Sequence, residues 1–198
     1  MKNEFLETIR ILDAQAMNLS YHQKRYESVL KHFGIKKFRC LEELMDPPKE
    51  GLYRSRVVYS PQHIDLIDVE YVKYHKKKIR TLKIIVDEEI DYTFKSTNRS
   101  ALDALYAKKE EAEDILIIKD GYITDTSIAN IAFYDGVWKT PQHPLLKGTT
   151  RQRYLDQGKL FVENIRVDEI KNFSKVALLN AMIDFDIIAD ENIKDVFC

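Results

Sequence analysis

The sequence has few of the features that mark several classes of protein. It contains two cysteines, Cys40 and Cys198, whose spacing indicates neither a metal site nor a disulfide framework, so we expect a reducing compartment. Charge of one sign is not in excess, because 31 basic residues stand against 32 acidic residues. The only notable basic run, Lys76-Lys77-Lys78, is typical of a hairpin tip. Nucleic acid is therefore not expected as a main partner.

Long apolar runs are missing as well. No stretch is apolar enough to span a bilayer, and residues 1–7 carry charges where a signal peptide would have an apolar core. The sequence therefore predicts a soluble, cytoplasmic protein without a membrane partner. It has no internal repeat and no low-complexity segment. Its 198 residues can bury a core and suit one large domain or two small lobes.

The hydrophobic pattern predicts an α+β fold with two lobes. Residues 1–90 are expected to form a small α/β lobe, with a helix over 21–33 where apolar residues recur every three or four positions. Segments rich in Val, Ile and Tyr predict an antiparallel meander, with strands over 52–59, 64–74 and 79–86. We place the hinge near residues 88–91.

Residues 91–198 are expected to form a larger, cofactor-binding lobe. The pattern returns there to helical periodicity and then to short apolar runs. Predicted helices cover 100–113, 149–157 and 168–173, and predicted strands cover 115–118, 128–134 and 176–179.

One ordered set of residues indicates a site with a chemical function. Lys95 supplies an amine, Asp125 supplies a carboxylate thirty residues later, and Gly148-Thr149-Thr150-Arg151 opens a predicted helix. An amine can form an imine with an aldehyde, a carboxylate can pair with a pyridine nitrogen, and the start of a helix can bind phosphate. These are the three parts needed to hold pyridoxal 5'-phosphate, and their order and spacing are more specific than any one of them.

The motifs resemble those of the class IV pyridoxal-phosphate enzymes, which include branched-chain and D-amino-acid aminotransferases and 4-amino-4-deoxychorismate lyase. The resemblance covers nearly the whole chain and rests on Glu7-Thr8-Ile9-Arg10, His22-x-x-Arg25 with Ser28, Lys95, Gly121 to Ser127 with Asn130, Thr140-Pro141, Gly148 to Arg151, and Asn180-Ala181-Met182. It implies fold type IV. It also implies a homodimer with sites near the interface.

The resemblance makes Lys95 the catalytic Schiff-base lysine. The chemistry then requires the site to lower the pKa of this amine from about 10.4 to roughly 7 or 8. Burial beside a cationic ring has that effect. Asp125 stands where the family usually has Glu and is implied to pair with the pyridine nitrogen. Aspartate is shorter by one carbon–carbon bond, about 1.5 Å, so either the backbone lies closer or the contact is looser; the alternative is a turn or cap residue.

The remaining cofactor residues are implied to hold the phosphate or line the site. Arg25 matches the family's phosphate-binding arginine. Thr149 and Thr150 would bind phosphate through hydroxyls and N–H groups and cap their helix at the same time. Asn180 either caps a turn or lines the site. His22 is interpreted as a structural neighbour rather than a catalyst.

Arg54 and Arg56 alternate with apolar residues, so both should point to one face of a strand. Exposed strand arginines are common, and that is one interpretation. If their face lines a cleft, they would instead bind the carboxylates of an anionic substrate.

The sequence around Lys95 favours one chemistry among several. Ser96-Thr97-Asn98-Arg99 resembles the lyase pattern rather than the Gly-Asn-Tyr of branched-chain transaminases, and Asn180-Ala181-Met182 resembles the lyase Asn-Ala-Leu. We therefore expect a 4-amino-4-deoxychorismate lyase that forms 4-aminobenzoate and pyruvate for folate synthesis. The alternatives are a branched-chain or D-amino-acid aminotransferase and a degenerate, non-catalytic domain.

The start of the chain differs from the family pattern. Family members usually have a strand-rich segment before the region that corresponds to Glu7, and this chain begins almost at that residue. The resemblance therefore implies a trimmed small N-terminal lobe.

Overall fold

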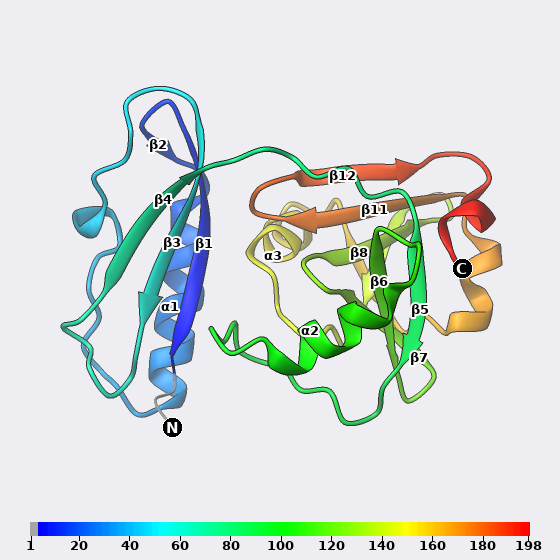
Figure 1. The fold of residues 1–198 in the computed structure, drawn as a ribbon, viewed down its shortest axis with the longest axis horizontal. Coiled ribbons are helices and arrows are strands. Elements are labelled where there is room, and N and C mark those ends of the chain that lie inside the picture. Colours follow the sequence, from blue (N-terminus) through cyan, green and yellow to red (C-terminus); the bar gives the residue numbers. More distant parts are fainter. Residues whose placement is uncertain (1–3) are drawn as a thin grey trace. The chain divides into compact units, whose positions relative to one another are not determined.

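The computed structural model describes residues 4–198, which form two compact units (Figure 1). The first unit comprises the described residues up to Lys76 together with Phe94–Asn98, and the second comprises Lys77–Thr93 and Arg99–Cys198. The chain therefore passes between the units three times, and the segment that carries Lys95 belongs to the first unit. Sheets with few helices confirm the predicted α+β class.

The first unit is a four-stranded antiparallel sheet with the helix α1 (Leu19–His32) against one face (Figure 1). The strand order is β2-β1-β3-β4. The strands are β1 (Phe5–Leu12), β2 (Gln15–Ala16), β3 (Leu52–Tyr59) and β4 (Asp68–Lys73), and a 3₁₀ turn covers Glu42–Leu44. The helix predicted over 21–33 is confirmed within two residues.

Alternation along β1 decides which side chains meet α1. Phe5, Ile9 and Ile11 point inward and pack with Tyr26 and Val29 of the helix. Burial of each such side chain stabilises the fold by about 1.5–3 kcal/mol. The inward row also contains Glu7, which has no exposed surface. A carboxylate therefore occupies a position that the pattern reserves for apolar residues.

The Lys95 segment lies beside the beginning of β1. The N–H of Leu6 donates to the carbonyl of Lys95 at 2.9 Å, and the N–H of Thr97 donates to the carbonyl of Glu4 at the same distance. The ring of Phe94 packs edge-on against Phe5, with centroids 5.8 Å apart. The backbone of Lys95 is thereby attached to β1 next to the residue that precedes Glu7.

The second unit contains an eight-stranded mixed sheet. Its main path is β10-β9-β8-β7-β6-β5, and β11 pairs with both β8 and β12. The strands are β5 (Leu82–Val86), β6 (Asp114–Lys119), β7 (Tyr122–Thr126), β8 (Asn130–Tyr134), β9 (Trp138–Pro141), β10 (Phe161–Glu163), β11 (Lys175–Asn180) and β12 (Asp184–Ala189). The helices are α2 (Ser100–Tyr106) and α3 (Thr149–Asp156), and 3₁₀ turns cover Ala107–Lys109, Val167–Asn172 and Ile193–Val196.

Strand β6 is buried on both faces. Leu116 and Ile118 pack into the core shared with β8 and β11, whereas Ile115 and Ile117 pack against α2. A strand that is covered on both faces has a continuous apolar sequence, and residues 115–118 show this pattern.

The sheet splits next to Asp125. Strand β8 pairs with β11 along its whole length on one side. On its other side it meets β7 through the pair Asp125–Asn130 and then meets β9 through Phe133 and Tyr134. Along this edge of β8, the neighbouring strand thus changes from β7 to β9. This change of neighbour leaves room at Asp125 for the loop that precedes α3.

The third segment of the predicted meander is a strand, but its predicted place in an antiparallel meander is wrong. β5 belongs to the second unit and pairs in parallel with β6. Lys76-Lys77-Lys78 therefore lies in the connection between β4 and β5 rather than at a hairpin tip. A segment rich in Ile, Leu and Val predicts a strand but does not identify the strand that pairs with it, which explains the error. The predicted helix over 168–173 is a 3₁₀ turn, and that over 100–113 leaves the α conformation after Tyr106.

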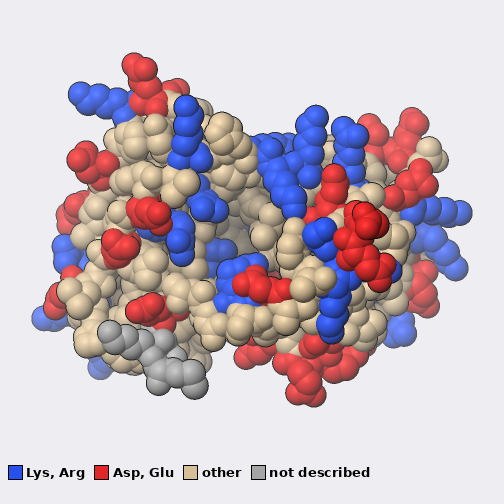
Figure 2. Space-filling view, viewed as in Figure 1, with Lys and Arg blue, Asp and Glu red and all other residues tan. Residues whose placement is uncertain are grey.

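Residues 4–198 contain no helix with the length and hydrophobicity needed to cross a bilayer. The face drawn in Figure 2 carries basic and acidic side chains in mixture rather than a broad area of one sign. Residues 1–3, part of the charged N-terminal segment noted above, lie outside the described residues.

Candidate functional site

The predicted site residues fall into two clusters, one in each unit. Arg25 and Lys95 belong to the first unit, as do Arg54 and Arg56. The second unit contains Asp125, Thr149, Thr150 and Asn180. Each cluster is described by itself.

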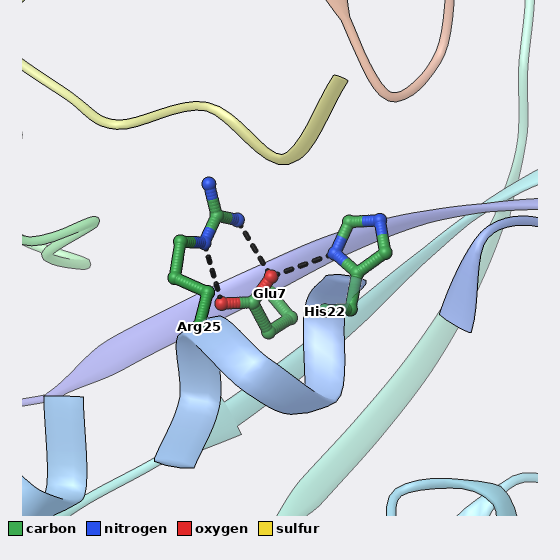
Figure 3. A network of polar contacts seen from close by, with 3 residues as sticks. All are labelled: Glu7, His22 and Arg25. Carbon is green, nitrogen blue, oxygen red and sulfur yellow. Dashed lines mark hydrogen bonds and ion pairs between the residues drawn. The ribbon is translucent and has the colours of Figure 1, made fainter. Parts of the chain in front are cut away.

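In the first unit, the carboxylate of Glu7 binds two side chains of α1 (Figure 3). Arg25 donates from Nε to Oε1 at 2.8 Å and from Nη2 to Oε2 at 2.6 Å. Nδ1 of His22 lies 2.7 Å from Oε2. Figure 3 shows Arg25 and His22 reaching the carboxylate from neighbouring turns of the helix. Three hydrogen bonds therefore connect β1 to α1.

The charge of Glu7 follows from these partners. Burial alone would raise its pKa, but the charge of Arg25 and the hydrogen bonds from His22 and Arg25 lower the pKa to about 2. Since the lowered pKa lies below the ordinary value of 4.5, the ionised group stabilises the fold above pH 4.5. That contribution, about 3 kcal/mol, is lost as the pH falls toward 2.

His22 is buried and remains neutral near physiological pH. Burial lowers its pKa, the contact with Glu7 opposes this effect, and the positive charges of Arg25 and Lys95 lower it further. The influence of Lys95 indicates that its half-buried side chain lies in the electrostatic neighbourhood of His22. Because an ionised Glu7 only accepts hydrogen bonds, Nδ1 of His22 carries the hydrogen in this contact.

Arg54 and Arg56 point to the same face of β3, as predicted, and this face is opposite α1. Arg10 joins them, because it lies directly across from Arg54 in the β1–β3 register. The Nε atoms of Arg10 and Arg54 are buried and make no hydrogen bond. Arg56 contacts Glu70 at 3.3 Å. Like charges directly across a sheet repel, so the Arg10–Arg54 pair favours an anion nearby.

In the second unit, Asp125 is a buried strand residue rather than a turn residue, with 4% of its surface exposed. Nδ2 of Asn130 donates to Oδ1 at 2.7 Å, and the N–H of Leu146 donates to Oδ2 at 2.9 Å. Asn130 also donates to the carbonyl of Leu146 at 2.8 Å. This arrangement connects β7, β8 and the loop before α3 at the split in the sheet.

Within the described part of the chain, no cation bonds directly to Asp125, and its pKa reflects this. Burial raises the pKa to about 6, while the N–H of Leu146, the amide of Asn130 and the charge of Arg151 oppose the rise. Arg151 is buried and donates from Nη2 to the carbonyl of Pro141 at 2.9 Å. Its Nε is buried and makes no hydrogen bond. The carboxyl of Asp125 is therefore held in place but is close to the point where it takes up a proton.

Thr149 and Thr150 begin α3, and both are buried. The N–H of Gln152 makes the first intrahelical bond, to the carbonyl of Gly148 at 2.9 Å. The N–H groups of the three preceding residues therefore lie outside the helical ladder, where an anion can bind.

Asn180 caps the turn between β11 and β12. Its Oδ1 accepts hydrogen bonds from the N–H groups of Met182 and Ile183 at 2.9 and 3.0 Å, and its Nδ2 lies 3.3 Å from the carbonyl of Ile128. Of the two alternatives for Asn180, the turn-capping role is the one seen. Among residues 4–198 there is no cluster of His, Cys, Asp or Glu that could hold a metal ion.

Comparison with known proteins places this chain in a family. The model of the class IV aminotransferases matches residues 60–188. The chain belongs to the class IV aminotransferase family. Enzymes of this family depend on pyridoxal 5'-phosphate.

Similar proteins match the chain over most of its length. An uncharacterized protein of Haemophilus influenzae is 34% identical over 183 residues, which cover 89% of this chain and 96% of that protein. A candidate 4-amino-4-deoxychorismate lyase from Haemophilus somnus 129PT has a solved structure with 35% identity and a TM-score of 0.82, covering 92% of this chain and 97% of that one. The branched-chain aminotransferase of Escherichia coli, at 13% identity, shares the fold with a TM-score of 0.72 and coverage of 97% and 79%. Fold type IV is confirmed.

Sequence reasoning missed the part played by Glu7 in this class IV chain. The motif Glu7-Thr8-Ile9-Arg10 matches the family, but the motif alone does not identify a partner for Glu7. Period-two alternation was the available signal, because Phe5, Glu7 and Ile9 share one face of a strand. A carboxylate in an inward row requires a buried partner, and the helix of Arg25 supplies it.

We predict that Gly148→Ala displaces Asn130. The backbone of Gly148 has φ −67° and ψ 143°, which alanine adopts without strain, but a Cβ would lie 2.0 Å from Oδ1 of Asn130. Moving Asn130 removes its hydrogen bonds to Asp125 and Leu146, at a cost of about 2 kcal/mol or more in the free energy of unfolding. Chemical denaturation of the purified variant measures this cost.

The control is Asn130→Ala alone and combined with Gly148→Ala. The double variant should be about as stable as Asn130→Ala, because the clash no longer exists. Full additivity of the two single effects would contradict the proposed contact.

We predict that Asp125 titrates near pH 6 in the cofactor-free protein. In the folded protein the pKa of Asp125 lies above the ordinary value of 3.8. The protonated carboxyl therefore contributes its full stabilisation of the fold below pH 3.8. About 3 kcal/mol is then lost as the pH rises through 6. Carbon-13 NMR of the labelled carboxyl, assigned by its loss in Asp125→Asn, measures the titration. Asn130→Ala should raise the pKa further, and a wild-type titration near 4 would contradict the dominance of burial.

Proposed function

We propose that this protein is a pyridoxal-phosphate-dependent lyase that converts 4-amino-4-deoxychorismate into 4-aminobenzoate and pyruvate. The observation that carries the proposal is the 35% identity, over 92% of the chain, to a candidate 4-amino-4-deoxychorismate lyase. The residues that follow Lys95 and those that begin at Asn180 add support, because both resemble the lyase pattern.

The two clusters fit the cofactor chemically. Asp125 is a carboxylate that neutral donors hold in place and that a protonated ring nitrogen would keep ionised. The N–H groups at the start of α3 and the guanidinium of Arg25 are donors suited to a phosphate dianion. Lys95 supplies the amine that links the cofactor to the chain. When bound, the cofactor supplies an acceptor for the electron pair left at the substrate carbon.

Lys95 moves the proton. Its free amine takes the proton from the ring carbon that bears the amino group of the substrate. The carbon–oxygen bond to the enolpyruvyl group then breaks, and that group takes up a proton and leaves as pyruvate. The ring becomes aromatic, which favours the products. The reaction needs no oxidant or reductant, because its products contain the same atoms as its substrate.

The basic face of the first unit suits this substrate, which carries two carboxylates. Arg54 and Arg56, together with Arg10 across from Arg54, present three guanidinium groups on one face of the sheet. Guanidinium groups bind carboxylates in paired geometry. We assign these arginines to substrate binding, and Arg10 is an addition to the predicted pair.

The setting of the activity is part of the same proposal. The product 4-aminobenzoate would serve folate synthesis in the cytoplasm. The protein would act as a homodimer, as the family resemblance implies. An aminotransferase acting on branched-chain or D-amino acids is the alternative, because it would use the same lysine and carboxylate and differ in where the proton goes. A non-catalytic domain is the third candidate, and protein that stays colourless with added pyridoxal 5'-phosphate would favour it.

We predict that the purified protein releases pyruvate from 4-amino-4-deoxychorismate and forms no glutamate from 2-oxoglutarate with a branched-chain or D-amino acid. Lys95→Ala should abolish both turnover and the visible absorption of the lysine-linked cofactor. Lys31→Ala is the matched control, because Lys31 forms an exposed pair with Glu27 on α1 and should leave both unchanged. Glutamate formation without pyruvate release would favour the aminotransferase, and activity in Lys95→Ala would remove the mechanism.

We predict that Thr150→Ala and Arg25→Ala lower the affinity for the cofactor more than they slow the chemical step. Each change removes a donor to the phosphate, and a charge-assisted hydrogen bond contributes about 1.5–3 kcal/mol, or roughly tenfold or more in affinity. Titration of the apoprotein with pyridoxal 5'-phosphate measures the dissociation constant. Gln152→Ala in the next turn of α3, where the side chain contacts Asp156, is the control. Unchanged affinity in both variants would remove the phosphate assignment.

A further inference from the structure

The reaction proposed above makes no use of Glu7, although this carboxylate has no exposed surface. Stability gives little reason for a buried ion pair at this position. Replacement of such a pair by apolar residues of similar size is often neutral or stabilising, because both charges lose their hydration. The geometry of the contacts points to another reason.

Glu7 holds the guanidinium of Arg25 by two parallel hydrogen bonds, through Nε and Nη2 at 2.8 and 2.6 Å. A bidentate contact fixes the plane of the guanidinium as well as its position. It uses two of the five N–H donors of the arginine. The direction of the other donors is therefore set by Glu7 rather than by the flexible side chain of Arg25.

His22 fixes Glu7 in turn. Its Nδ1 is 2.7 Å from Oε2, the oxygen that also accepts from Nη2 of Arg25. His22 and Arg25 are three positions apart on α1 and so lie on the same face of the helix. Only 1% of the surface of His22 is exposed, so the packed imidazole holds Oε2 of the carboxylate in place.

We propose that Glu7 is a positioning residue that, together with His22, orients the guanidinium of Arg25 for the phosphate of the cofactor. This inference rests on the proposed function, in which Arg25 binds that phosphate. It assigns Glu7 and His22 no contact with the substrate or with the reacting atoms.

Whether Glu7→Gln strengthens or weakens phosphate binding distinguishes a positioning role of Glu7 from an effect of its charge alone. The negative charge of Glu7 by itself repels a phosphate dianion. If charge were its only influence, Glu7→Gln would strengthen phosphate binding. If Glu7 orients Arg25, the same change weakens it, because a neutral amide cannot accept both hydrogen bonds of the guanidinium.

The test compares pyridoxal 5'-phosphate with pyridoxal, which lacks the phosphate. The dissociation constant of pyridoxal divided by that of pyridoxal 5'-phosphate isolates the phosphate contribution, whereas a general loss of structure would weaken the binding of both ligands alike. We expect Glu7→Gln to reduce this ratio by about tenfold or more, the loss of one charge-assisted hydrogen bond. Glu7→Asp should lie between Glu7→Gln and the wild type. Glu27→Gln on the same helix, where Glu27 contacts Lys31, should leave the ratio unchanged.

An unchanged or increased ratio in Glu7→Gln would overturn the inference. If that variant cannot be isolated folded, Arg25→Lys decides the question, because lysine keeps the charge but cannot form the bidentate contact. A reduced ratio in Arg25→Lys supports positioning, and an unchanged ratio overturns it. A wild-type protein that binds both ligands equally well, or neither, would instead remove the proposed function.

A second measurement uses the cofactor-free protein. Nitrogen-15 NMR of the imidazole of His22 should show a neutral ring with its hydrogen on Nδ1 at neutral pH, as donation to Glu7 requires. A hydrogen on Nε2 would contradict the part assigned to His22. In Glu7→Gln the preference for Nδ1 should be lost.

Discussion

A carboxylate buried among apolar side chains must be compensated by other polar groups, and each candidate cluster of this protein is built around one such carboxylate. Glu7 meets a guanidinium and an imidazole, so its pKa is lowered to about 2. Asp125 meets mainly neutral donors, an amide and a backbone N–H, so burial dominates and its pKa is raised to about 6. The partners of each carboxylate, rather than its chemistry, decide the pH at which it takes up a proton.

The polar groups that compensate each buried carboxylate also determine which segments of the chain come together. Glu7 joins the first strand to a helix that begins fourteen positions after Phe5, and the Lys95 segment lies against that same strand. Asp125 joins two strands and the loop before α3, at the point where the sheet splits. The close approach of Asn130 to Gly148 belongs to this second junction and requires a residue without a Cβ. Both clusters are thus products of packing around a single charged or titratable group.

Much of the fold follows from local pattern. The helix over 21–33 and the strand over 52–59 were predictable because their periodicity depends only on neighbouring residues. The partner of the strand over 79–86 was not predictable, because residues with a high strand propensity occur in both parallel and antiparallel pairs. In the proposed site, the order of Lys95, Asp125 and the Gly148–Arg151 turn in the sequence was enough to predict a cofactor role for them. Arg10 received no role, because its position opposite Arg54 depends on strand register.

The sequence by itself determined the residue types and their order: an amine, a carboxylate and a threonine-bearing helix start, with a pattern of elements that predicted an α+β class IV fold. Only the tertiary structure decided that Glu7 holds Arg25 and His22, that Asp125 lies in a strand beside a split sheet, and that Asn180 caps a turn. Periodicity reports which face of an element a side chain occupies. The hydrogen bonds and charge of a buried group depend on residues distant in the chain, which only folding brings within reach.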